Sequence, residues 1–318
     1  MENVIEKCEL CPRRCGVRRA ETGAGFCQSG AAPRIARAAL HFWEEPPISG
    51  KRGSGAVFFT GCPLRCLYCQ NHEISAGENR GKAVTPEELS AVFFYLVEQG
   101  AHNINLVTAS HYAPFVRDAL LVKKLPVPVV FNCSGYERVE TLKTLEGLVD
   151  IYLPDFKYAE NGLAARLSAA PDYREAALSA LAEMERQAGA PVYDGEGMMR
   201  RGVLVRHLIL PGHTRNSIAV LELLSERFPR LPVSLMAQYT PPATGPQLAS
   251  ESRLATGARL ATGARLAEFP ELCRPITKRE LQKVQDRLFE LGLDGFVQSR
   301  SAKGLGYVPD FHQFGEPS

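Results

Sequence analysis

Residues 56–71 read AVFFTGCPLRCLYCQN, an apolar run that leads into three cysteines within eight positions. The run at 55–60 is typical of a buried strand, and Cys62, Cys66 and Cys69 follow it on a C-x3-C-x2-C loop. Three such thiolates can hold three corners of a cubane iron–sulfur cluster, and no fourth cysteine lies nearby in the sequence to close its shell. One iron is therefore left open. This indicates a catalytic cluster, because clusters that only transfer electrons normally have every iron ligated by protein.

The same loop allows a second interpretation as a zinc site. His72 follows Cys69 after two intervening residues and would complete a Cys3His ligand set. Zinc motifs usually divide their ligands between two separated pairs, which this loop does not do. The spacing therefore favours the cluster.

Composition bounds the class of protein. The chain has 318 residues, 45% of them hydrophobic, which suits one large α/β domain with appendages. The 37 basic and 35 acidic residues are spread along the sequence, and the net charge of +2 provides no electrostatic footprint for nucleic acid. There is no apolar run of about 18 residues and no apolar segment at the start, so we expect no membrane contact and a cytoplasmic location.

Four more cysteines lie in residues 1–30, at Cys8, Cys11, Cys15 and Cys27, among turn-forming glycines and a proline. In a cytoplasmic chain such a set indicates metal ligands and not a disulfide framework. Four soft ligands can close around zinc or around a second iron–sulfur cluster, and the spacing does not choose between them. Reduced structural cysteines without metal are the remaining alternative.

The middle of the chain alternates apolar and amphipathic segments, the pattern of repeated βα units on a parallel sheet. The clearest helix begins at Thr85 as N-cap, has Pro86 at the first helical position and Glu88 as capping-box partner, and ends at Gly100. We expect strands at 55–60, 103–108, 127–132, 149–153, 203–210 and 233–237. We expect later helices at 113–124, 136–147, 172–188, 215–228 and 277–291.

Six strand–helix units predict an α/β fold, a partial (β/α)6 TIM-like barrel open on one side. The expected division is a cysteine-rich metal-binding segment with a linker at 1–49, the barrel at 50–245, and a C-terminal helical extension at 246–318. Residues 253–267 repeat a six-residue unit twice and begin a third copy. The repeat is too short for a solenoid, so we interpret it as an insertion before the last helix.

The cysteine loop resembles the radical S-adenosylmethionine (SAM) motif C-x3-C-x-aromatic-C, with Tyr68 as the aromatic residue. The resemblance implies that Cys62, Cys66 and Cys69 hold a [4Fe-4S] cluster and are the catalytic ligands. It also implies that the open iron chelates the amino and carboxylate groups of SAM. The reduced cluster would then cleave SAM to methionine and a 5′-deoxyadenosyl radical.

Beyond this loop, roughly residues 55–240 resemble the pyruvate formate-lyase activating enzymes. That family carries Gly-Gly-Glu after its second strand, against the SAM amino group, whereas residues 107–110 of this chain read VTAS. Ser110 or a backbone carbonyl would have to accept the hydrogen bonds of that group. His111, which follows, is either an acid/base group or ligand in the site or a local hydrogen-bonding group.

The resemblance implies further cofactor contacts at the ends of the third and fourth strands. Asn132 and Ser134 take the place where the family turns past the ribose, and Cys133 between them is expected to be a packing residue. Asp155 and Lys157 match an Asp-x-Lys that contacts the methionyl end of SAM. The physics agrees, because alternate residues leaving a strand project to one side and an ammonium suits a carboxylate.

The resemblance also implies contacts from the fifth and sixth strands. Arg206 lies in an otherwise apolar strand, where it must find an anion or several carbonyls, so it is expected to contact SAM or to form a structural ion pair. Gln238 or Tyr239, at the end of the sixth strand, is expected to contact the adenine or the substrate.

The function implied is that of a radical SAM oxidoreductase that receives electrons from flavodoxin or ferredoxin. The leading substrate is a glycine of a partner protein, as for glycyl-radical activating enzymes. Modification of another peptide or of a small molecule is the main alternative, and a non-enzymatic iron–sulfur or zinc scaffold is the alternative from another class.

Overall fold

The computed structural model describes residues 5–20, 25–76, 81–242 and 265–298. The repeat expected at 253–267 lies outside the described residues except for its last three positions. The expected domain boundaries at 49/50 and 245/246 remain predictions.

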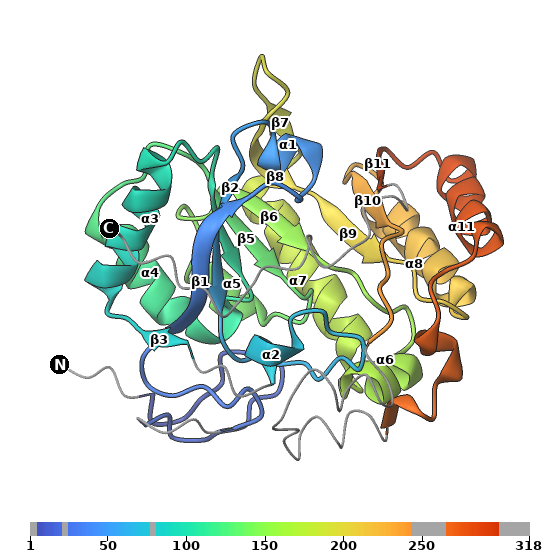
Figure 1. Ribbon diagram of the computed structural model, residues 1–318, viewed down its shortest axis with the longest axis horizontal. Helices are drawn as coiled ribbons and strands as arrows, with labels where there is room; N and C mark the ends of the chain where they lie inside the picture. The colour runs from blue at the N-terminus through green and yellow to red at the C-terminus, as the bar shows by residue number, and fades with distance from the viewer. Residues whose placement is uncertain (1–4, 21–24, 77–80, 243–264, 299–318) are drawn as a thin grey trace, which may run out of the picture.

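The centre of the molecule is a curved wall of parallel strands (Figure 1). Its first part consists of β2 (Ser54–Phe59), β4 (Ile104–Val107), β5 (Val129–Cys133), β6 (Ile151–Pro154) and β8 (Met199–Val203). Its second part consists of β9 (Val205–Leu208), β10 (Val233–Met236) and β11 (Gly295–Gln298). A bridge between Asp155 and Arg206 joins the two parts, and the Phe156 N–H donates to the Arg206 carbonyl at 2.8 Å.

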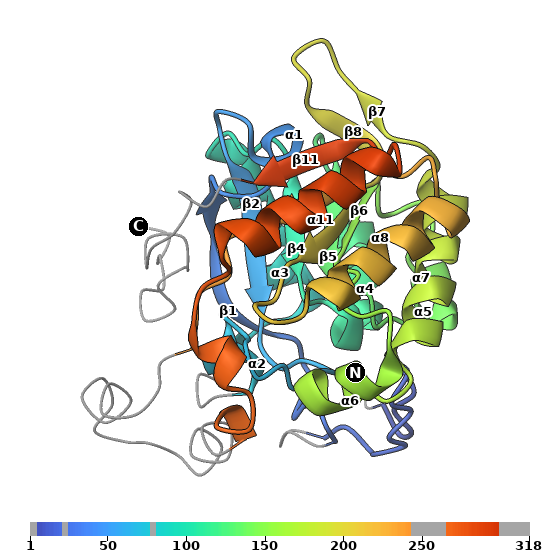
Figure 2. The same ribbon diagram turned by 90° about the vertical axis from the view of Figure 1, so that its right-hand side faces the viewer.

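Helices cover the outer face of this wall, which makes the fold a partial TIM-like barrel (Figures 1 and 2). They are α3 (Pro86–Glu98), α4 (Ala113–Val122), α5 (Val139–Lys143), α6 (Asn161–Ser168), α7 (Tyr173–Ala188), α8 (Thr214–Arg227) and α11 (Lys278–Glu290). The predicted capping box of α3 is confirmed, because Thr85 accepts from the Glu88 N–H and the Glu88 carboxylate accepts from the Thr85 N–H. None of the helices in the described ranges is long and apolar enough to cross a membrane.

Side chains alternate along the strands between the helix-covered core and the barrel interior. On β4, Ile104 and Leu106 belong to the main hydrophobic core, as does Phe131 on β5. Asn105 and Asn132, their neighbours in sequence, face inward and donate to one carboxylate inside the barrel. The strand pattern therefore creates a polar interior within an apolar shell.

Several elements differ from the sequence-based expectation. The segment taken as a linker contains β1 (Arg34–His41), which pairs antiparallel with β2 and with β3 (Lys82–Ala83). The helix expected at 136–147 is shorter, because α5 spans only Val139–Lys143. The Thr144 hydroxyl donates to the Thr141 carbonyl at 2.7 Å, and such local bonds compete with helix propagation.

The remaining short elements lie at the two ends of the strands that form the wall. They are α1 (Pro46–Ser49), α2 (His72–Ser75), the hairpin strand β7 (Val192–Tyr193), and the 3-10 helices η1 (Ser110–Tyr112) and η2 (Pro270–Cys273). In Figure 1, α1 and β7 lie above the strands, and α2 lies below them, where β2 ends. The cysteine-rich N-terminal segment lies at the same end of the strands as α2.

Candidate active site

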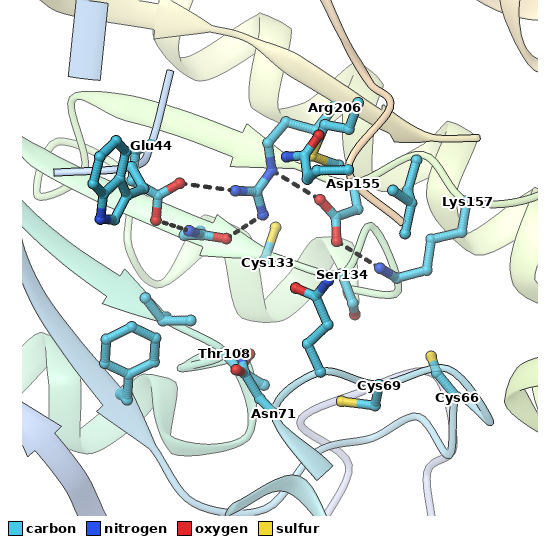
Figure 3. Close-up of a pocket in the computed structure, with 18 of the residues that line it drawn as sticks. Glu44, Cys66, Cys69, Asn71, Thr108, Cys133, Ser134, Asp155, Lys157 and Arg206 are labelled. Carbon is cyan, nitrogen blue, oxygen red and sulfur yellow. Dashed lines mark hydrogen bonds and ion pairs between the residues drawn. The ribbon is translucent and has the colours of Figure 1, made fainter. Parts of the chain in front are cut away.

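The barrel encloses a cavity of about 770 Å³. Cys62, Cys66 and Cys69 line one side of it, and the carboxyl ends of the parallel strands line another, together with β11 and the loop between β1 and α1. Figure 3 shows Cys66 and Cys69 across the cavity from a group of charged side chains. The cavity thus has a thiol side and a charged side.

Each of the three thiols has one hydrogen-bonding neighbour. The Leu64 N–H donates to Cys62 Sγ at 3.4 Å, Ser75 Oγ lies 3.4 Å from Cys69 Sγ, and Ser168 Oγ lies 2.9 Å from Cys66 Sγ. Sulfur bonded to a metal accepts such hydrogen bonds, so the surroundings suit ligating thiolates.

Backbone hydrogen bonds attach the cysteine loop to the end of α6. The Arg65 N–H donates to the Ser168 carbonyl at 3.1 Å, and the Leu67 N–H donates to the Leu167 carbonyl at 2.9 Å. These carbonyls belong to the last turn of α6, where helix carbonyls lack intrahelical partners. The loop is therefore held by a helix that the sequence-based reading did not predict.

The opposite side of the cavity is a charged network of Glu44, Asn132, Asp155, Lys157 and Arg206 (Figure 3). The Arg206 guanidinium donates to Asp155 at 2.8 Å, to Glu44 at 3.0 Å and to Asn132 Oδ1 at 2.6 Å. Lys157 Nζ donates to the other oxygen of Asp155 at 2.5 Å. The four charged side chains are only 10–17% exposed, so these are largely desolvated pairs.

The pKa shifts in this network follow from burial and pairing. Burial acts to raise the pKa of Asp155, but the charges of Arg206 and Lys157 outweigh it and hold that pKa below its usual value. Burial acts to lower the pKa of Lys157, and the Asp155 charge reverses the effect and raises it. Both groups therefore stay charged at neutral pH.

Glu44 was missed in the sequence because it lies between β1 and α1, in what looked like a linker. Its carboxylate accepts from the Asn105 and Asn132 amides at 3.1 and 3.2 Å as well as from Arg206. The adjacent Glu45 accepts from Gln298 Nε2 on β11 at 3.2 Å. The loop thus bridges from β1 to β11 across the open side of the barrel, and nothing in its local pattern signals this.

Thr108 belongs to the segment VTAS at 107–110, which stands where the activating enzymes carry Gly-Gly-Glu. It lines the cavity and has a left-handed backbone with φ of 61°, which is unusual for a β-branched residue. Ser110, expected to hold the SAM amino group, instead donates to buried Glu137 at 2.9 Å and is not among the residues that line the cavity. Strain of this kind gathers at functional sites.

The other expected contacts divide between the cavity and its walls. Asn132, Ser134 and Gln238 line the cavity, whereas Tyr239 is buried and donates to the Leu272 carbonyl at 2.7 Å. His111 is buried and 2.8 Å from the Thr60 carbonyl. Burial, aided by the Arg19 charge, lowers the pKa of His111 to about 3, so it is a neutral local hydrogen-bonding group.

Comparison with known proteins identifies the family. The model of the radical SAM superfamily matches residues 56–224, more than half of the chain. The chain belongs to the radical SAM superfamily. Its membership makes it an enzyme and implies a [4Fe-4S] cluster and SAM, and enzymes of this superfamily typically need a reductant such as flavodoxin or ferredoxin.

A curated relative of this radical SAM protein is "Uncharacterized protein MJ0674" of Methanocaldococcus jannaschii, 27% identical over 303 residues, which cover 92% of this chain and 77% of the relative. Among solved structures, Streptococcus suis SuiB bound to its precursor peptide SuiA has a TM-score of 0.46 and 10% identity. A radical SAM methyltransferase of Sphaerobacter thermophilus has a TM-score of 0.49 and 14% identity.

A domain of a pyruvate-formate lyase-activating enzyme from Bacteroides vulgatus has a TM-score of 0.35 and 14% identity. These three matches cover 75%, 80% and 67% of this chain. They cover 46% of SuiB, 67% of the methyltransferase and 91% of the activating-enzyme domain, so the radical SAM protein spans less than half the length of SuiB.

The thiol side of the cavity fits the cluster that the family implies. Burial raises the pKa of the Cys66 thiol to about 11, opposed by the Lys157 charge, and burial raises the pKa of Cys62 as well. Such thiols ionise when a metal supplies positive charge. In the part of the chain that the structure describes, no three His, Cys, Asp or Glu side chains converge as ligands of one ion.

The N-terminal cysteines of the radical SAM protein lie beneath the cysteine loop. Arg13, which stands between Cys11 and Cys15, donates to the Pro63 carbonyl and to the Ala169 carbonyl, both at 2.6 Å. It thereby joins the N-terminal segment to the cysteine loop and to the end of α6.

Cys8, Cys11 and Cys27 are buried and Cys15 is exposed. Burial is the main cause that raises the pKa of Cys11 to about 12, and the charges of the other three thiols contribute.

Proposed function

We propose that this radical SAM enzyme holds its [4Fe-4S] cluster on Cys62, Cys66 and Cys69 and binds SAM in the cavity between these thiols and the charged network. The observation that carries the proposal is that three half-buried thiols and a fixed pair of cations, Lys157 and Arg206, line the same cavity on opposite sides. When bound and reduced, the cluster supplies the electron that cleaves SAM to methionine and a 5′-deoxyadenosyl radical.

The side chains of the network have distinct tasks in this proposal. Lys157 pairs with the SAM carboxylate, while Asp155 fixes the position of its ammonium. Asn132 and Ser134 offer polar groups to the ribose from the end of β5. Thr108, through its hydroxyl or carbonyl, takes the acceptor role expected of Ser110, because Thr108 lines the cavity and Ser110 does not.

Arg206 is a positioning residue in this scheme. It keeps bonds to Asp155, Glu44 and Asn132, so it holds the groups that contact SAM as well as lining the cavity itself. Gln238 lies on the same cavity wall and is proposed to contact the nucleoside or the substrate, whereas Tyr239 supports the wall from behind.

Metal analysis and turnover test the proposal together. Anaerobically purified protein is expected to contain about four irons at this site, and Cys62→Ala, Cys66→Ala and Cys69→Ala should each abolish the site's electron paramagnetic resonance signal. Dithionite-reduced wild type with SAM should form 5′-deoxyadenosine, and the three variants should not. Zinc retained at this site in place of iron, or iron without SAM cleavage, would refute the proposal.

For the substrate, we propose abstraction of hydrogen from a glycine of a partner protein, supported by the resemblance over residues 55–240. A glycyl radical protein encoded beside this one is the candidate to test. Reduced enzyme, SAM and that protein should yield a glycyl radical signal that is lost when the glycine is changed to alanine. Deoxyadenosine formation without such a signal would favour another peptide or a small molecule.

We also propose a second metal site on Cys8, Cys11, Cys15 and Cys27. Backbone bonds from Cys8 N–H to the Val17 carbonyl and from Gly16 N–H to the Cys8 carbonyl, both 2.9 Å, hold this segment in a tight hairpin. Cys8, Cys11 and Cys15 lie on this hairpin, and Cys27 follows twelve residues after Cys15. Four thiolates within twenty residues can surround a metal without help from the barrel.

A variant lacking Cys62, Cys66 and Cys69 isolates this second site. About four irons left in the triple variant would identify an auxiliary cluster, and one zinc would identify a structural site. A triple variant that contains neither metal would refute a metal at the N-terminal cysteines.

A further inference from the structure

We infer that a chain of buried hydroxyls, Tyr68, Tyr158 and Ser168, donates hydrogen bonds toward Cys66 and raises the reduction potential of the cluster that this cysteine holds. The inference rests on the proposed cluster site. It assigns Ser168 and Tyr158, which no sequence motif marks, a positioning role, and it explains why the aromatic residue of the motif is a tyrosine here.

The chain is continuous in space although its members are far apart in sequence. Tyr68 Oη lies 2.6 Å from Tyr158 Oη, Tyr158 Oη lies 2.5 Å from Ser168 Oγ, and Ser168 Oγ lies 2.9 Å from Cys66 Sγ. Tyr68 comes from the cysteine loop, Tyr158 from the segment after β6, and Ser168 from the last turn of α6. Three separate elements thus converge on one sulfur.

The chemistry of the thiolate determines the direction of every proton in the chain. A metal-bound thiolate has no proton, so Ser168 must donate to Cys66. The Ser168 proton is then used, and Tyr158 must donate to Ser168. By the same reasoning Tyr68 must donate to Tyr158. All three hydroxyl dipoles therefore point at the sulfur, and hydrogen bonds aligned in this way strengthen one another.

Burial makes this chain effective. Ser168 and Tyr158 are 0% exposed and Tyr68 is 7% exposed, so water does not compete for the hydroxyls. The two backbone bonds between the cysteine loop and α6 hold Ser168 in register with Cys66.

Cys66 differs from the other two ligands in this respect. The bonds at Cys62 and Cys69 are 3.4 Å long, whereas that from Ser168 is 2.9 Å and is backed by two further hydroxyls. Hydrogen bonds to cluster sulfurs are a recognised control on iron–sulfur potentials. Reduction adds negative charge to the cluster, and donors stabilise that charge. Removal of the donors should therefore make the cluster harder to reduce.

The experiment is a redox titration of anaerobically prepared holoenzyme, followed by electron paramagnetic resonance of the radical cluster. Ser168→Ala is expected to reduce the equilibrium constant for cluster reduction about tenfold, a shift of about 59 mV to more negative potential. Tyr158→Phe should shift the potential in the same direction by less, because the direct bond from Ser168 to Cys66 remains. Tyr68→Phe should shift it in the same direction by still less, because it removes only the outermost hydroxyl.

Tyr136→Phe is the matched control. Tyr136 is 1% exposed and its hydroxyl donates to Asp172 at 2.6 Å, but it makes no hydrogen bond to a cluster thiol. The reduction potential of the cluster in Tyr136→Phe should equal that in wild type. Equal potentials in Tyr158→Phe and in the control, with about four irons retained in each, would overturn the inference and leave the proposed function intact.

Two further outcomes separate the proposals. Wild-type protein that holds no iron on the motif cysteines would refute the proposed function itself and, with it, this inference. If Ser168→Ala fails to retain iron, Tyr158→Phe decides, because it preserves the ring and the direct bond from Ser168 to Cys66.

Discussion

Arg206→Met tests the charged network most directly, because methionine keeps an apolar chain of similar length and removes only the guanidinium. Three hydrogen bonds are lost, to Asp155, Glu44 and Asn132. Asp155 keeps Lys157 as a cation, whereas Glu44 keeps only the amides of Asn105 and Asn132. The variant therefore leaves one carboxylate buried without a counter-charge.

The expected cost follows from that unpaired carboxylate. Removing one partner of a buried ion pair costs about 3–5 kcal/mol, and the amides that remain on Glu44 place this case near 3 kcal/mol. Because Glu44 is the source of the penalty, Arg206→Met combined with Glu44→Gln should recover much of the loss. A double-mutant cycle of the two changes should give a coupling energy of about 1–3 kcal/mol.

The assay is urea unfolding of anaerobic protein followed by circular dichroism, with iron content measured in every variant. Arg287→Met is the control, since Arg287 pairs with Glu222 at 2.8 Å and with Glu290 at 2.9 Å while these three side chains are 33%, 47% and 63% exposed. Each of these exposed pairs should contribute less than about 1 kcal/mol. An Arg206→Met cost no larger than the control, or an absent coupling with Glu44→Gln, would refute the account of the network.

Three further changes test separate parts of the site. Lys157→Met should weaken SAM binding to the holoenzyme about tenfold to a hundredfold in calorimetry with iron content unchanged, whereas the control Lys143→Met on α5 should leave SAM affinity unchanged. Equal SAM affinities in Lys157→Met and wild type would remove Lys157 from the SAM site. Burial raises the pKa of Glu137 from 4.5 to about 7, so the contribution of this carboxyl to stability falls as pH rises through that range. In urea unfolding, Glu137→Gln should therefore gain up to about 3 kcal/mol in stability over wild type between pH 5 and pH 8. A stability difference that does not change with pH would contradict this. Thr108→Gly should stabilise the fold by about 0.5–1 kcal/mol through relief of the left-handed backbone, and a loss above 1 kcal/mol would show that the threonine side chain supports the site.

Much of the barrel could be predicted from sequence because its strands are short apolar runs and its helices carry local start and stop signals. β2 was expected at 55–60 and spans Ser54–Phe59, and α11 was expected at 277–291 and spans Lys278–Glu290. Both depend on information within about 15 residues. The cysteine loop was readable for the same reason, since its three ligands lie close together.

The elements that were missed depend on distant partners. β1 reads RIARAALH, in which arginines interrupt the apolar pattern, and it is a strand because β2 pairs along its length. β11 reads GFVQ, too short to stand out, and it forms alongside β10. Glu44 and Ser168 belong to the site only because the chain brings them within reach of Arg206 and Cys66, 162 and 102 residues away.

The contacts in the charged network connect Glu44, which lies outside the predicted barrel, to Lys157 in the proposed SAM site. Asp155 gives one carboxylate oxygen to Arg206 and the other to Lys157. In the proposed function, Arg206 keeps Asp155 paired, so Lys157 can turn toward the SAM carboxylate without leaving a buried charge unpaired. Arg206 can do this only if its own position is fixed, and the carboxylate of Glu44 fixes it from the opposite side. The loop between β1 and α1 is therefore linked to Lys157, the residue proposed to hold the SAM carboxylate, through three successive ion pairs: Glu44 with Arg206, Arg206 with Asp155, and Asp155 with Lys157.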